Sequence, residues 1–300
     1  GMQQQIIHFL KNSKNYLSGE EISRSLSMSR ANIWKYMQEL RKDGYDIIAV
    51  PHLGYKLISS PDRLFPHEIQ CDLGTKFLGK PIIYHDAVHS TMDEAFALGV
   101  QDAPGGTIVC AESQAKGRGR MGRSWVSPKG KGIYASIILR PQLPPIQVPK
   151  LTLLAAVAVA SAVKTTTGVD LSIKWPNDLL VGSKKVAGIL TELSAETDRV
   201  KFVVIGIGLN VNTTVSQLPE GATSLRQETQ ESFSRVAILQ EVLRQIEQWY
   251  LRFEKEGFAP VVERWKELNL TLGKRVRIAD PAGFIEGEAV DIDDDGGLLI

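Results

Sequence analysis

The order of apolar and polar positions divides the first part of the chain into three predicted helices and a hairpin. Apolar residues recur at helical spacing along residues 3–11, and Ser18 with Glu21 forms a capping box before a second helix. Ser29 can cap a third helix, and residues 45–57 alternate in polarity around a glycine turn. The third helix has one apolar face made of Ile33, Met37 and Leu40. This order predicts a winged helix-turn-helix, whose third helix enters a DNA major groove.

Polar and basic side chains lie off the apolar face of this third helix. The alternative interpretation is a small helical protein-interaction domain with a solvated basic face. The caps, the turn and the hairpin occur in the order of a winged helix, so we favour DNA binding. The residues predicted to contact DNA are Ser29, Arg30, Asn32, Lys35 and Arg41.

A polar segment with a proline, residues 59–62, predicts the end of a DNA-binding domain over residues 1–60. Beyond it, strand-like and helical runs alternate in a second domain over residues 61–270. Tight links join several of the strands, which favours an α+β fold on a mixed or antiparallel sheet over a doubly wound parallel sheet. Strands are predicted at 82–85, 107–111, 132–139, 171–174, 186–193 and 200–207, and helices near 92–98, 148–166 and 233–256.

The pattern changes again from residue 271, where short strands alternate with Gly and Asp turns. Residues 271–300 are therefore predicted to form a small SH3-like β-barrel. Because the sequence stops on an apolar strand with no partner after it, we expect the natural chain to continue beyond Ile300.

Composition excludes several classes of protein. The apolar run 151–163 is too short to cross a bilayer and predicts a buried helix, and no signal peptide is visible. Two cysteines suit a reducing cytosol, so we expect a cytoplasmic protein without a membrane partner. The five histidines show no metal-ligand spacing, so no all-protein metal site is predicted. The net charge is only +1, so anion binding requires a local cluster of cations.

The densest cluster is KGRGRMGRSW, residues 116–125, with four cations and three glycines. Glycines allow the backbone to approach a ligand, arginines match carboxylate and phosphate oxygens, and a tryptophan offers a stacking face. The alternatives are an RG-rich nucleic-acid segment and a solvated basic loop. RG segments are usually repeated in disordered surroundings, whereas this one leads into a strand, which favours capture of an anionic ligand.

Three further motifs accompany this loop. KWPND, residues 174–178, is predicted to expose an Asn and an Asp after a proline turn. KKVAGIL, residues 184–190, places Lys185 at the start of a buried strand, where the lysine needs an anionic partner. The alternative for Lys185 is a surface lysine beside a hairpin. GIGLNVN, residues 206–212, offers small residues and an amide, although spaced glycines commonly mark only a bulge. Ser90-Thr91 precedes a helix and is equally consistent with helix capping alone.

Together, GRGRMGRSW, KWPNDLLV, KKVAGILTEL, GIGLNVN and HSTMDEA stand in the order found in biotin protein ligases. With the winged helix in front, the whole chain resembles the bifunctional biotin protein ligase and biotin operon repressor. The resemblance implies synthesis of biotinyl-5′-AMP from biotin and Mg-ATP. Biotin is then transferred to a lysine of the biotin carboxyl carrier protein of acetyl-CoA carboxylase.

The resemblance also implies roles for individual residues. Lys185, Arg118 and Arg120 would neutralise charge during the reaction, since two anions meet in the first step. Magnesium would be held through the ATP phosphates. The biotin-binding residues would be Ser90, Thr91, Met92, Gln114, Arg118, Gly119, Arg120, Lys185, Gly188 and Gly206. The ATP-binding residues would be Arg123, Trp125, Lys174, Asn177, Asp178 and Asn210.

One position departs from the family pattern. Met92 stands where the family has asparagine after Ser-Thr, so a side-chain hydrogen bond to the ring is not available there. Two other functions compete with the ligase: a lipoate-attaching enzyme of the same broad fold, and a ligand-sensing transcription factor that has lost catalysis. The second would lack Lys185 or the loop arginines, and both are present.

A single winged helix contacts few phosphates, so its binding to DNA should be weak. We therefore expect a homodimer that forms when biotinyl-AMP is bound and that recognises operator DNA with two half-sites. In this hypothesis the basic loop becomes ordered on the adenylate and then contributes to the subunit contact.

Overall fold

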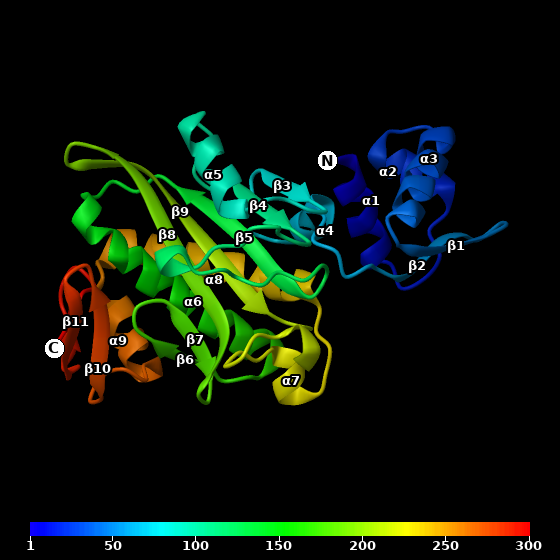
Figure 1. Ribbon diagram of the computed structural model, residues 1–300. Helices are drawn as coiled ribbons and strands as arrows, with labels where there is room; N and C mark the ends of the chain where they lie inside the picture. Colours follow the sequence, from blue (N-terminus) through cyan, green and yellow to red (C-terminus); the bar gives the residue numbers. More distant parts are fainter. The chain divides into compact units, whose positions relative to one another are not determined.

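The computed structural model describes residues 1–300 and divides into two compact units, Gly1–Leu73 and Gly74–Ile300 (Figure 1). The first has the elements predicted for a winged helix, and the second carries the large sheet.

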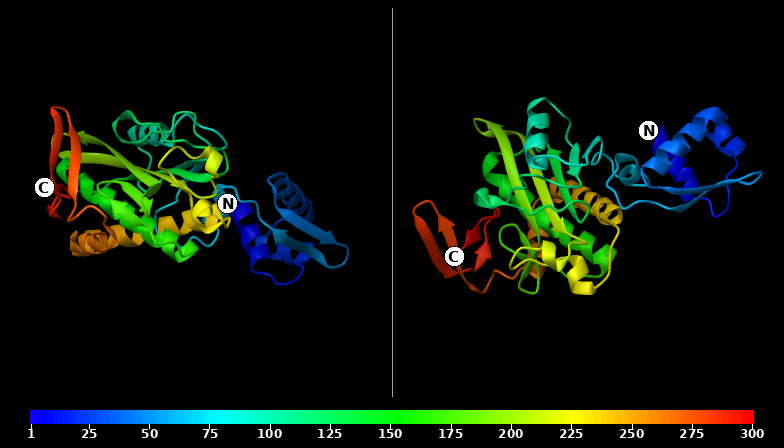
Figure 2. Two further views of the ribbon diagram at one scale, coloured as in Figure 1. Left: turned by 60° about the horizontal axis from the view of Figure 1, so that its bottom comes forward. Right: turned by 45° about the vertical axis from the view of Figure 1, so that its right-hand side comes forward.

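The first unit contains three helices and a hairpin. Helix α1 spans Met2–Lys11, α2 spans Gly19–Leu26 and α3 spans Arg30–Lys42. Strands β1, Asp46–Val50, and β2, Gly54–Ser59, pair antiparallel and project from the helices as the wing (Figure 2). Ser18 and Ser29 accept hydrogen bonds from backbone N–H groups three residues on, so both serines cap their helices. The Glu21 side chain makes no return bond to Ser18, so the predicted capping box is only half formed.

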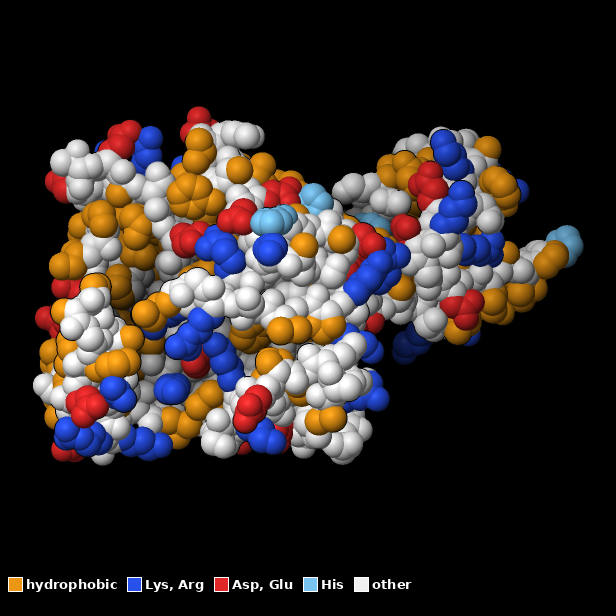
Figure 3. All heavy atoms as spheres, viewed as in Figure 1, with side chains coloured by type: hydrophobic (Ala, Val, Ile, Leu, Met, Phe, Trp, Pro, Cys, Tyr) orange, Lys and Arg blue, Asp and Glu red, His pale blue; other side chains and the backbone are white.

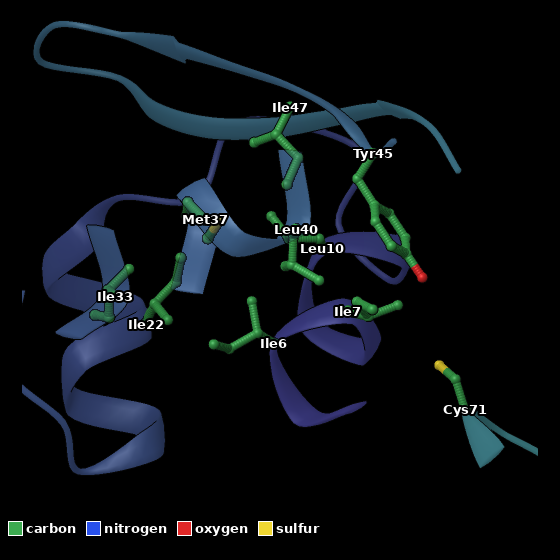
Figure 4. Packing of buried hydrophobic residues seen from close by; sticks show 10 residues of the cluster. All are labelled: Ile6, Ile7, Leu10, Ile22, Ile33, Met37, Leu40, Tyr45, Ile47 and Cys71. Carbon is green, nitrogen blue, oxygen red and sulfur yellow. The ribbon is translucent and has the colours of Figure 1, made fainter. Parts of the chain in front are cut away.

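Figure 4 shows the buried core of this unit, where side chains from all three helices meet the first strand of the wing. A short helix, α4 at Pro66–Gln70, follows the hairpin and packs against α1. Its Glu68 is buried, with Lys11 and Tyr45 as its partners. The first unit consequently extends past the boundary predicted near residue 60. Its core contains Ile6, Ile7, Leu10, Ile22, Ile33, Met37, Leu40, Tyr45, Ile47 and Cys71.

The second unit is built on a seven-stranded sheet in the order β3-β4-β5-β9-β8-β7-β6. Only β3 and β4 pair in parallel, and every other pair is antiparallel, which confirms the prediction of a mixed sheet. The strands are β3 Ile82–His85, β4 Ile108–Ala111, β5 Gly132–Leu139, β6 Ser172–Lys174, β7 Asp178–Val181, β8 Lys184–Glu196 and β9 Arg199–Asn210.

Helices cover both faces of this sheet (Figures 1 and 2). Helix α5, Thr91–Val100, packs on β5 and β9 from one side. From the other side, α6, Val148–Thr167, packs on β8 and against α8, Arg235–Glu256. The remaining helices are α7 Leu225–Thr229 and α9 Ala259–Leu268, with 3-10 turns η1 Arg120–Gly122, η2 Pro145–Gln147 and η3 Val215–Gln217.

Helix α6 confirms the predicted buried helix but corrects the reasoning from its length. The helical segment Pro145–Thr167 is long and apolar enough to cross a membrane. Twelve residues of α6 are nevertheless buried within the protein, between the sheet and its neighbouring helices. The segment therefore forms part of the core of this domain.

The last thirty residues form two two-stranded antiparallel sheets. Strand β10, Arg275–Asp280, pairs with β11, Gly283–Glu288, and β12, Asp291–Ile292, pairs with β13, Leu298–Leu299. The four short strands agree with the β-rich segment predicted from the Gly and Asp turns. They do not close into one sheet, so the SH3-like barrel remains a prediction.

Candidate active site

A cavity of about 370 Å³ opens where the centre of the sheet meets the basic loop 116–125. Its walls come from the loop, from β7, β8 and β9, and from β10 and β11 near the C-terminus. On the face seen in Figure 3, Lys and Arg side chains gather beside β6 and β7. Six cations line the cavity against the single carboxylate of Asp178, so the site is strongly suited to an anion. These cations are Arg118, Arg120, Arg123, Lys174, Lys185 and Arg277.

The basic loop is held at its base by Arg118. The guanidinium donates to both carboxylate oxygens of Glu192, at 2.8 and 3.0 Å, and to Asp93 at 2.7 Å. The hydrogen bonds to Glu192 raise the pKa of Arg118 above its ordinary value. Arg120 and Arg123, which follow in the loop, remain exposed. Arg118 thus anchors the loop while the other two arginines are available to a ligand.

Trp125 lies across two glycines of the central strands. A Cβ at Gly208 would stand 2.6 Å from the indole, and one at Gly188 would stand 3.3 Å from it. Gly208 is therefore needed for the tryptophan to rest on the sheet, whereas a Cβ at Gly188 would require only a small shift of the ring. The Lys185 ammonium lies 5.3 Å from the indole centroid, within cation–π range. The indole N–H is buried against the strand and has no acceptor.

Lys185 is the second residue of strand β8, and its Nζ lies 2.8 Å from a carboxylate oxygen of Asp178. The two residues meet because β7 and β8 are antiparallel neighbours, with Asp178 opposite Gly188. Asn177 has turned inward, where its amide donates to the Ile189 carbonyl at 2.7 Å. The KWPND turn thus supplies the anionic partner that a lysine near the core requires.

The inner end of the cavity is neutral and rich in hydrogen-bonding groups. Gln114 accepts from the Thr91 N–H at 2.9 Å and donates to the Ser127 hydroxyl at 3.0 Å. The Thr91 hydroxyl lies 2.8 Å from that of Ser136, which is fully buried on β5. Such a cluster can recognise a small polar ring by donating and accepting hydrogen bonds.

Met92 forms the apolar side of this inner end. Its side chain is 4% exposed and packs against Gly206, where any Cβ would collide with the sulfur. The methionine therefore fills space beside the glycine, in a position where the family pattern has an amide.

Most residues predicted for biotin or ATP do line the cavity, and two do not. Ser90 is buried and accepts from the Asp93 N–H at 3.3 Å, which is the helix-capping role left open by the sequence. Asn210 is also buried and donates to the Thr223 carbonyl at 3.1 Å. The lining residues that sequence reasoning missed include Gly208, Arg277 and Phe284. Gly208 lies within the quoted GIGLNVN motif, whereas no local signal marked the other two.

Helix α3 presents the residues predicted to contact DNA. Arg30, Asn32 and Lys35 are exposed. Arg41 has a different role, because its guanidinium donates twice to the Ile47 carbonyl, at 3.0 and 2.8 Å, and so holds the wing to the helix. Trp34, which the sequence analysis did not single out, is 58% exposed on the same helix.

Family models match all three parts of the chain. Residues 84–210 match the biotin/lipoate A/B protein ligase family, residues 2–56 match an HTH domain, and residues 271–300 match the biotin protein ligase C-terminal domain. The bifunctional ligase/repressor BirA of Bacillus subtilis is 43% identical over 97% of this chain and 91% of its own length. The protein of the same name from Escherichia coli is 32% identical over 98% of this chain and 91% of its own.

Solved structures agree with these relatives. A biotin protein ligase from Aquifex aeolicus in complex with biotin and ATP superposes with a TM-score of 0.62 at 33% identity, over 74% of this chain and 91% of that one. This chain combines a winged helix, a mixed sheet and a basic loop, and it is similar to these relatives over nearly its full length. The chain belongs to the family of bifunctional ligase/repressor BirA proteins.

Proposed function

We propose that the chain activates biotin with ATP and transfers it to a lysine of a biotin carboxyl carrier protein. In the first step, a biotin carboxylate oxygen attacks the α-phosphorus of ATP, and the bond to the diphosphate breaks. In the second, the lysine amine attacks the carbonyl of biotinyl-5′-AMP, loses a proton and expels AMP. The names of the relatives, among them a biotin protein ligase with biotin and ATP bound, support this choice of substrates.

The observation that carries the proposal is the charge of the cavity, where six cations line the walls and three carboxylates pair with only two of them, Arg118 and Lys185. Two anions must approach one another in the first step, and their repulsion falls when fixed cations surround the meeting point. Lys185 is suited to this place because Asp178 and Trp125 already hold its ammonium. No protein nucleophile is required, so positioning and charge neutralisation provide the catalysis.

The two ends of the cavity suit the two halves of the substrate pair. Thr91 and Gln114 would take the ureido ring of biotin, with Met92 and Gly206 beside it and with Ser136 holding the Thr91 hydroxyl from behind. Trp125, Lys174 and Arg123 would surround the nucleotide at the outer end.

Magnesium also fits the residues present, through the nucleotide. Mg²⁺ is usually held by one or two carboxylates together with substrate phosphates. Asp178 is the only carboxylate that lines the cavity, so it would hold the ion jointly with the phosphates. The bound ion would supply further positive charge at the phosphates.

The test is pyrophosphate release by the full chain with Mg-ATP and biotin, with lipoate and octanoate as parallel arms. We expect release with biotin alone, and mass spectrometry of the protein fraction should detect biotinyl-AMP. Release with lipoate or octanoate, and none with biotin, would identify the lipoate-attaching alternative. A chain that binds biotin but releases no pyrophosphate would be a sensor without catalysis.

We propose in addition that the chain represses biotin-synthesis genes in the cytoplasm as a homodimer loaded with biotinyl-AMP. The winged helix and the HTH match support DNA binding, with Arg30 and Lys35 positioned to contact phosphates. Sedimentation and gel-shift titrations on the biotin-operon promoter, with and without biotinyl-AMP, test this. Equal operator affinity in both states would leave a ligase that is not controlled by its adenylate.

A further inference from the structure

A second cluster of ligating side chains lies in the first unit, outside the ligase site. His8 stands on α1, and Cys71 and Asp72 directly follow α4. One ligand atom from each of the three lies within 4.8 Å of the others. The His8 Nδ1 atom is 2.8 Å from one Asp72 oxygen, and the Cys71 sulfur is 3.8 Å from the other.

These distances approach those of a tetrahedral metal site. Zinc binds sulfur at about 2.3 Å and nitrogen or oxygen at about 2.0–2.2 Å, so tetrahedral ligand atoms are about 3.3–3.8 Å apart. The three donors therefore need to move little to share one ion. One thiolate and one carboxylate would also balance the charge of a divalent cation.

Space for the ion and for a water molecule adjoins the cluster. A cavity of about 290 Å³ is lined by His8, Cys71 and Asp72 together with Gln4, Gln5, Phe9 and Leu26. His8 and Asp72 are about half exposed, which gives an entry path, whereas Cys71 is 4% exposed. Figure 4 shows Cys71 at the edge of the buried core, with its sulfur turned toward Ile7 of α1.

We propose that His8, Cys71 and Asp72 form a binding site for a zinc-class divalent cation. The sulfur and imidazole donors select zinc or cobalt over magnesium and calcium, which prefer oxygen. A water molecule completes the coordination from the cavity. The ion displaces the thiol proton of Cys71 and joins α1 to the chain segment that ends the first unit, so it adds to the stability of that unit. Histidine spacing gave no sign of the site because its ligands come from opposite ends of the unit.

The test is titration of the reduced, metal-free full chain with Co²⁺, followed by displacement with Zn²⁺. We expect a sulfur-to-cobalt charge-transfer band and the intense visible bands of tetrahedral cobalt. Cys71→Ser should abolish the charge-transfer band, and His8→Gln and Asp72→Asn should each weaken binding by more than about tenfold. Matched controls are Cys110→Ser, which removes the other cysteine, and His52→Gln on the exposed wing.

A charge-transfer band that persists in Cys71→Ser, or no band in the parent chain, would overturn the proposal. Should Cys71→Ser fail to fold, the exposed His8 and Asp72 decide the question. Unchanged cobalt affinity in both of those variants would reduce the His8–Asp72 contact to an ordinary surface ion pair. A zinc-dependent rise in unfolding temperature, absent in His8→Gln, would be independent support.

Discussion

Replacing Lys185 by alanine should stop adenylate formation without unfolding the protein. The stability cost is small because Lys185 and Asp178 are 35% and 26% exposed, and ion pairs with that much solvent contribute about 1 kcal/mol or less. The lost cation–π contact with Trp125 adds about 0.5–1 kcal/mol. The rate effect is larger, since removal of one preorganised group that stabilises developing charge costs about 100- to 1000-fold.

The assay is single-turnover pyrophosphate release at saturating biotin and Mg-ATP, with thermal unfolding measured on the same samples. Lys184→Ala is the matched control, because Lys184 precedes it on β8, is exposed and lies outside the cavity. We expect normal release from the control and a loss of at least about 100-fold from Lys185→Ala. Equal turnover in the two folded variants would refute the reasoning and return Lys185 to a surface role.

Arg120→Gly should keep the fold and release biotinyl-AMP about tenfold to a hundredfold faster, because one charge-assisted contact of about 1.5–3 kcal/mol is lost. The measurement is the rate of adenylate dissociation, and an unchanged rate would contradict the assignment. Gly208→Ala should displace Trp125, because the new methyl carbon would stand 2.6 Å from the ring, at a cost of about 1–3 kcal/mol. Calorimetric titration should then detect weaker ATP binding, whereas normal affinity would mean that the indole need not rest on this strand. Trp34→Ala should change the free energy of unfolding by less than about 0.5 kcal/mol, because the side chain is 58% exposed. It should weaken operator binding in gel shifts, and equal operator affinity of the variant and the parent chain would exclude a DNA contact.

Local patterns predicted the elements that depend on local chemistry. The two serine caps, the apolar face of α3, the turn and the alternating hairpin together predicted the winged helix, because capping, helical spacing and strand alternation act over a few residues. The strands β8 and β9 were also found, although the structure extends both. Strand β7 was missed because the KWPND turn hides its short run of apolar residues. Helices α4, α7 and α9 were missed as well, the first two because they span only five residues each.

The candidate site was predictable where one motif carries its own chemistry. The cations of the basic loop and the partnership of Lys185 with an anion followed from residue type, and the structure pairs Lys185 with Asp178. Contributions from distant parts of the chain could not be found in this way. Arg277 and Phe284 reach the cavity from the C-terminal strands, and the guanidinium stacks on the ring at 3.7 Å. The positions of these two residues depend on the packing of the C-terminal strands beside the large sheet, which local sequence patterns do not encode.

The acidic partners of Arg118 and Lys185 act as counter-ions supplied by the protein itself. Six cations lie close together in the cavity and repel one another. Asp93, Glu192 and Asp178 neutralise part of their charge and so reduce this repulsion. An incoming carboxylate or phosphate therefore exchanges with protein carboxylates as well as with ions from solution. Because fewer salt ions are released in such an exchange than from a bare basic patch, ligand affinity should respond weakly to ionic strength, in contrast to the binding of operator DNA. The same chain would then keep its small ligand bound over a range of salt concentrations in which its affinity for DNA falls.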